Sequence, residues 1–78
     1  MITVEQVKAA RSLLRWNQHE LANTSGLAIS TIRRMEGKSG LLSGYAENVW
    51  KVQSALEEAG IIFIDKDGAA GVGVRLRE

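Results

Sequence analysis

The stretch QHELANTSGLAISTIRRME, residues 18–36, predicts two short helices separated by a glycine. Asn17 and Glu20 form a capping-box pattern, in which each side chain bonds the backbone of the other, so a helix is expected directly after Asn17 and as far as about residue 24. Gly26 can adopt the left-handed conformation that ends a helix and turns the chain sharply. A second helix is then predicted over residues 29–36.

Further helices are predicted on both sides of this stretch. Thr3 and Gln6 form another capping box, and the helix that follows it ends near Arg15. Its apolar stripe is Val7, Ala10, Leu13 and Leu14. After a glycine-containing break at residues 37–40, Ser43 is expected to cap a longer helix that stops at Gly60. The apolar positions of that helix are Val49, Val52, Leu56 and Ala59.

The last part of the chain follows a different pattern. Ile61–Ile64 is rich in residues that favour strands, residues 66–68 carry a turn signal, and residues 72–77 alternate between apolar and other residues. This predicts a C-terminal β-hairpin. The expected fold class is therefore mainly α, with about four helices over residues 1–60 and a hairpin over residues 61–78.

The composition of the chain argues against several classes of function. The 78 residues suffice for one domain, and the absence of cysteine excludes disulfides and thiolate metal sites. The single His19, the lack of facing carboxylate pairs and the lack of a glycine-rich phosphate loop argue against an enzyme, a metal site and a cofactor. No apolar run approaches the roughly 18 residues of a membrane span, and no secretory signal is visible, so we expect a cytoplasmic protein without a membrane partner.

Charge is distributed unevenly along the chain. Residues 1–40 hold six Lys and Arg against three Glu, and residues 41–78 hold four against six Asp and Glu, which gives net charges of +3 and −2. The first half is therefore the candidate for contact with a polyanion such as DNA.

The predicted helix at residues 29–36 has a face suited to base pairs. Ile32 and Met35 are expected to pack inward, which leaves Ile29, Ser30, Arg33 and Arg34 pointing outward. Two short helices joined by a tight turn are the arrangement that fits a DNA major groove. The outward side chains offer methyl contact, hydroxyl hydrogen bonds and guanidinium forks to base edges.

Residues 4–60 resemble the lambda-repressor and Cro-like (Xre-type) helix-turn-helix DNA-binding domains. The resemblance is carried, in order and at family spacing, by Ala10-Arg11, Leu14-Arg15-Trp16, Gln18, Glu20-Leu21-Ala22, Gly26-Leu27 and residues 30–36. It departs from the family at Ala28, where a Ser or Thr usually caps the recognition helix. The hairpin also replaces the family's fifth helix, and the ending from residue 55 onward resembles the tail of short bacterial and prophage regulators.

The resemblance implies a role for each matching position. Bases would be read by Ile29, Ser30 and Arg34. The DNA backbone would be contacted by Asn17, Gln18, Arg33 and Lys38. Arg11 and Glu36 would form a structural ion pair. The implied function is a transcriptional regulator, a repressor rather than an activator, that binds an inverted repeat in double-stranded DNA as a homodimer.

The hairpin is the expected dimerisation element. Its first strand is apolar on both faces, whereas a hairpin covering a small helical core needs only one apolar face. The predicted dimer contacts are Ile62, Phe63, Ile64 and Val74. Trp16 is expected to be a core anchor, while Trp50 is left between a dimer contact and packing under the loop that contains Tyr45. The alternative function is an antitoxin or antiactivator whose main partner is another protein, a toxin or an activator.

Overall fold

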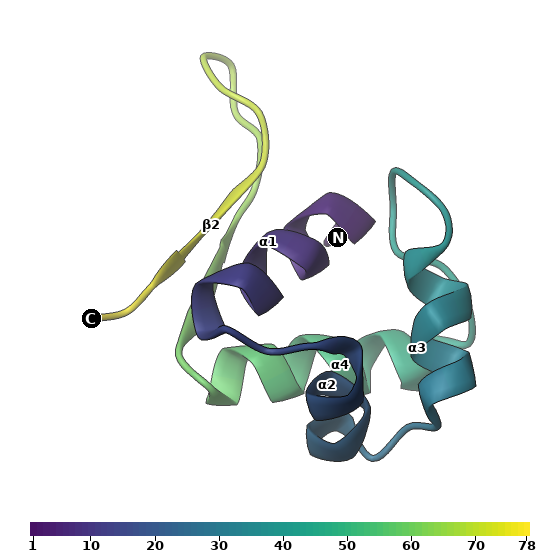
Figure 1. Cartoon of the computed structure of the whole chain (residues 1–78). Helices are drawn as coiled ribbons and strands as arrows, with labels where there is room; N and C mark the ends of the chain where they lie inside the picture. Colours follow the sequence, from purple (N-terminus) through teal and green to yellow (C-terminus); the bar gives the residue numbers. More distant parts are fainter.

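The chain forms four helices followed by a two-stranded antiparallel hairpin in a computed structural model that describes residues 1–78. The elements are α1 (Val4–Leu14), α2 (Gln18–Ser25), α3 (Ile29–Glu36), α4 (Ala46–Glu58), β1 (Ile61–Ile64) and β2 (Gly73–Leu76). The prediction of a mainly helical chain with a C-terminal hairpin is confirmed. The hairpin lies beside α1 and α4, on the side of the helices away from α3 (Figure 1). None of the helices has the length and apolarity needed to cross a bilayer.

Both predicted capping boxes are present. Thr3 Oγ1 accepts from the Gln6 amide at 3.0 Å, and Gln6 Oε1 accepts from the Thr3 amide at 2.8 Å. Asn17 Oδ1 and the Glu20 carboxylate make the matching pair of bonds at 2.9 and 3.1 Å. These bonds satisfy amides that a helix start otherwise leaves without partners, so sequence spacing alone fixes where α1 and α2 begin.

The start of α4 differs from the prediction. Tyr45, not Ser43, occupies the N-cap position, and no side chain caps the helix. The preceding segment is instead held by the N-terminus, because the Leu42 amide donates to the Ile2 carbonyl at 3.0 Å and the Val4 amide donates to the Gly40 carbonyl at 2.8 Å. Ser43 therefore lies in the segment between this pairing and the helix, two residues before the N-cap Tyr45.

One predicted core position is wrong. Leu13 was expected on the apolar stripe of α1, but 43% of it is exposed. At about 100° per residue, three-residue steps from Val4 to Leu13 rotate the position by about 180°, which carries it off the buried face. Leu14 lies back on that face and packs against the core.

The core contains residues from all four helices, from the segment before α1, from the segment between α3 and α4, and from β1. Its buried apolar residues are Ile2, Val4, Val7, Ala10, Leu21, Ala22, Ile32, Met35, Leu42, Val52, Ala55, Leu56 and Ile61. Ile2 and Leu42 were not predicted, since they lie outside helices, in two segments that pair through Thr3 and Leu41.

A buried glutamine attaches the hairpin to α1. Gln6 is 3% exposed, and its Nε2 donates to the carbonyls of Ile64 at 3.1 Å and Gly73 at 2.9 Å. The same side chain therefore caps α1 through its oxygen and bonds both strands through its nitrogen. At the hairpin loop, amides of Ala69 and Ala70 donate to Asp67 Oδ1 and lower the pKa of that carboxyl.

The register of the hairpin divides the expected dimer contacts between two faces. Phe63 pairs with Val74, and both pack against the chain's own core. Because cross-strand partners share one face, part of each of these two side chains is used within the chain, and both remain half-buried. Their contact with a second copy stays a prediction. Ile62 and Ile64 lie on the opposite face, where Ile64 is 41% exposed.

Candidate functional site

The α2–α3 unit has a sharp turn between its helices. Gly26 ends α2 in the left-handed conformation with φ 74°, and the Leu27 amide donates to the Ala22 carbonyl at 3.1 Å. Ile32 and Met35 on α3 are buried, as predicted. The inner face of α3 is thus fixed on the core, and its opposite face is left at the surface.

The outer face of α3 carries polar and cationic side chains. Ser30, Arg33 and Arg34 are exposed, and Lys38 follows just beyond the helix. Ile29 differs from its predicted place, because it is half-buried and packs against the core. Only part of its surface is available for contact with another molecule.

A buried ion pair joins α1 to the end of α3. Arg11 donates from Nε to Glu36 Oε2 at 2.8 Å and from Nη2 to Oε1 at 2.6 Å. The Glu36 side chain is 2% exposed and that of Arg11 is 18% exposed. Since Glu36 is the only acidic residue between residues 29 and 38, the exposed charges of this segment are all positive.

The side chains predicted to contact the DNA backbone from α2 already have partners within the chain. Gln18 is half-buried, and its Nε2 donates to Glu36 Oε1 at 3.3 Å. Asn17 caps α2 through its side-chain oxygen. Trp16 packs against the core, as its expected anchoring role requires, and its carbonyl accepts from Arg11 Nη1 at 3.1 Å.

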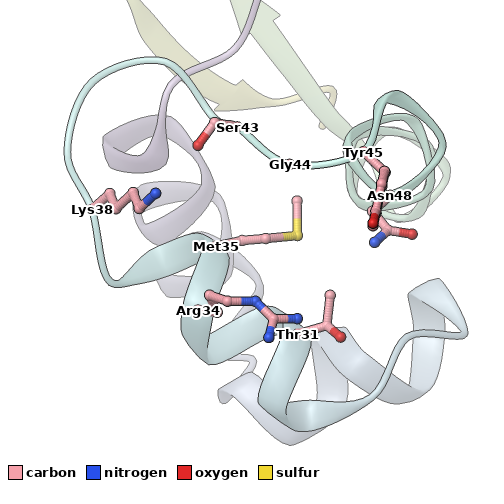
Figure 2. A pocket seen from close by; sticks show the side chains of 8 residues that line it. All are labelled: Thr31, Arg34, Met35, Lys38, Ser43, Gly44, Tyr45 and Asn48. Carbon is pink, nitrogen blue, oxygen red and sulfur yellow. The ribbon is translucent and has the colours of Figure 1, made fainter.

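A groove of about 550 Å³ runs between α3 and the start of α4. It is lined by Thr31, Arg34, Met35, Lys38, Ser43, Gly44, Tyr45 and Asn48. Figure 2 shows Met35 projecting from α3 toward α4, with Arg34 and Lys38 on the α3 side of the groove and Tyr45 and Asn48 on the α4 side. Two cations therefore face an exposed phenol and an amide across an open hollow.

Sequence reasoning missed the α4 side of this groove. Tyr45 is 82% exposed, and Asn48 lies in the first turn of α4. Both are 11 to 14 residues from Arg34 in sequence, and only the fold of the 37–45 segment brings them beside α3. The sequence carried no signal for this contact, because a helix capped by Ser43 would place Tyr45 inside the helix.

Ala28 offers a direct test of how the start of α3 is held. It occupies the N-cap position with extended backbone, φ −67° and ψ 147°, and makes no side-chain cap bond. Ala28→Ser should supply that bond and raise the free energy of unfolding by about 0.5–2 kcal/mol. Chemical denaturation followed by circular dichroism measures the change. The matched control is Ala9→Ser at an exposed interior position of α1, where serine should slightly destabilise the helix. Equal effects of the two substitutions would contradict the cap geometry.

No group of three or more His, Cys, Asp or Glu side chains is placed to hold a metal ion. Comparison with models of protein families finds none that matches the chain, and comparison with curated proteins finds no similar sequence.

Proposed function

We propose that this chain is a sequence-specific DNA-binding transcriptional regulator in which α2 and α3 act as a helix-turn-helix unit. One observation carries the proposal. The outer face of α3 and the residues just after it expose Ser30, Arg33, Arg34 and Lys38, while the only carboxylate of the segment is buried against Arg11. A helix with a free cationic face and a firmly packed inner face is suited to lie in a major groove.

The side chains divide between reading bases and holding phosphates. Arg34 can donate a bidentate pair to O6 and N7 of guanine, and the Ser30 hydroxyl can bond either a donor or an acceptor on a base edge. Arg33 and Lys38 are assigned to the phosphate backbone, where they set position and add salt-dependent affinity. Ile29 contributes at most an edge of its side chain to a thymine methyl, because the rest is packed against the core.

The groove between α3 and α4 extends the proposed contact. Tyr45 and Asn48 offer a phenol and an amide at the wall opposite Arg34 and Lys38. Hydroxyl and amide groups are common donors to phosphate oxygens. We assign them to a phosphate next to the bases that α3 reads. Gln18, whose amide already bonds Glu36, then supports the end of α3 in addition to any phosphate contact.

The proposed regulator acts as a homodimer on an inverted repeat. Two copies of α3 related by a twofold axis would meet half-sites about 34 Å apart, one turn of the double helix. A dimer bound over a promoter excludes polymerase by occupancy and needs no further contact, so we propose repression as its effect. The resemblance to the lambda-repressor and Cro-like family supports the same assignment.

The test is selection of bound sequences from a random DNA pool, followed by affinity measurement by fluorescence anisotropy. The expected result is a selected inverted repeat bound at least about 1,000-fold more tightly than scrambled DNA, with affinity that falls steeply as salt rises. Equal affinity for selected and scrambled DNA at the same salt concentration would refute sequence-specific binding.

A second candidate function rests on the large exposed side chain of Trp50, 68% of which is accessible. Such a residue is suited to anchor a protein partner. An antitoxin or antiactivator that binds a toxin or an activator would use it in that way. Co-purification of a second, different chain in stoichiometric amount would favour this function.

A further inference from the structure

The largest exposed apolar side chains gather at one place on the surface. Trp50 on α4 and Leu41 in the 37–45 segment are 68% and 58% exposed, and with Met1 and half-buried Val49 they line one groove of about 490 Å³. A second hollow, which shares Met1 and Leu41 with the first, extends the apolar area to Val72. These five residues, Met1, Leu41, Val49, Trp50 and Val72, are called the Trp50 surface below.

Clustering distinguishes the Trp50 surface from the other exposed apolar residues. On the hairpin, Ile64 and Leu76 are 41% and 38% exposed, but the register places them on opposite faces. Scattered apolar side chains are normal on a protein surface, whereas contiguous ones mark a place of contact. The contiguous apolar area without a covering partner is thus the Trp50 surface and not the paired strands β1 and β2.

We propose that the Trp50 surface is the interface at which two copies of this chain associate.

The five apolar side chains supply about half of the area that a small dimer needs, and a polar rim around them can supply the rest. A stable interface buries about 600–1,000 Å² on each partner. The exposed parts of the five apolar side chains supply on the order of 400 Å². Interfaces of this kind consist of an apolar centre and a polar rim. Here the rim is available in Ser43 and Gln53 on one side and in Asp65 and Lys66 on the other.

The surface is self-complementary, which a twofold interface requires. An indole that projects beside an apolar groove can enter the same groove on the second copy, and the second indole enters the first. Charge does not oppose this approach, because Glu47 and Lys51 next to Trp50 form an ion pair of opposite signs at 3.3 Å. Asp65 and Lys66 likewise balance each other on the other flank.

Position favours a second copy over a foreign protein, and this step rests on the proposed function. The groove beside Trp50 and the groove beside α3 share Ser43 and Gly44 as lining residues. Association centred on Trp50 therefore brings the two α3 helices toward the twofold axis, whereas the paired strands β1 and β2 lie on the side away from α3 (Figure 1). Neighbouring half-sites need the first arrangement.

The test is sedimentation velocity of the full chain over a range of concentrations. Trp50→Glu places a carboxylate at the centre of the interface and should raise the dimer dissociation constant at least about 30-fold. Leu41→Glu should act in the same direction. Ile64→Lys on the hairpin is the matched control and should leave the dissociation constant unchanged. Thermal unfolding of each variant confirms that it is folded, which is expected because the three positions are exposed.

Three outcomes would overturn the proposal. The first is a wild type that is monomeric at about 100 µM. The second is a Trp50→Glu variant that dimerises like wild type. The third is an Ile64→Lys variant that is monomeric. Failure of the proposed interface and failure of the proposed function can be told apart. Fluorescence anisotropy with DNA that holds a single half-site measures DNA binding separately from dimerisation. A wild type that dimerises through the Trp50 surface but binds no DNA refutes only the function. A wild type that binds the inverted repeat while Trp50→Glu stays dimeric refutes only the interface.

Discussion

Glu36→Ala is expected to lower the free energy of unfolding by about 3–5 kcal/mol, because it leaves a largely buried Arg11 without its counter-ion. The substitution removes both bonds of the bidentate pair and also the acceptor of Gln18 Nε2. At about 0.05–0.15 kcal/mol per residue, the whole chain has a stability of roughly 4–12 kcal/mol, so this loss is a large share of it. Thermal and urea unfolding followed by circular dichroism measure it, with a fall in Tm of about 12–40 °C expected.

The control for this prediction is a second carboxylate in an ion pair on the surface. Glu47→Ala removes the partner of Lys51, but the Glu47 side chain is 75% exposed and water replaces the lost contact. Its effect should stay within about 0.5 kcal/mol. The double variant Arg11→Met with Glu36→Leu should recover part of the loss, since no unpaired charge remains. A Glu36→Ala variant as stable as Glu47→Ala would show that the pair does not hold α1 to α3.

Arg34→Ala is expected to weaken binding of the selected operator by about 1–3 kcal/mol, which is roughly 5- to 150-fold in affinity. The reason is loss of a bidentate donor at the outer face of α3, so discrimination should relax at one base position in each half-site. Fluorescence anisotropy with the operator and with its single-base variants measures both effects. Stability should be unchanged, because the Arg34 side chain is exposed and none of the side-chain hydrogen bonds or ion pairs of the chain involves it.

Two comparisons sharpen the Arg34 test. Arg75→Ala removes an equal charge from the exposed hairpin, on the side away from α3, and should change affinity little. Gln18→Ala should weaken binding to all sequences alike, and because Gln18 also bonds Glu36 it should lower stability slightly as well. If Arg34→Ala and Arg75→Ala weaken binding equally and without change in base preference, Arg34 acts only through net charge.

The outward placement of Ser30 and Arg34 could be predicted because it follows from helical periodicity around Ile32 and Met35. The presence of the Arg11–Glu36 pair followed from family resemblance, since nothing in the local sequence joins residues 25 positions apart. Tyr45 and Asn48 were missed because nothing in the local sequence joins them to Arg34 either. Their place opposite Arg34 depends on the path of the 37–45 segment, which is fixed by bonds to the N-terminus.

The sequence by itself determined the element order and the points at which α1 and α2 begin and α2 ends. Capping boxes and a left-handed glycine act over three or four residues, so their signals are complete within short windows. Only the tertiary structure decided which apolar surfaces remain uncovered. Phe63 and Val74 pack against the core on a hairpin that Gln6, about sixty residues away, holds beside α1 by bonding both strands, while Trp50 is left exposed. Whether an apolar side chain is buried depends on which distant segment packs against it, and the spacing of residues within one segment does not contain that information.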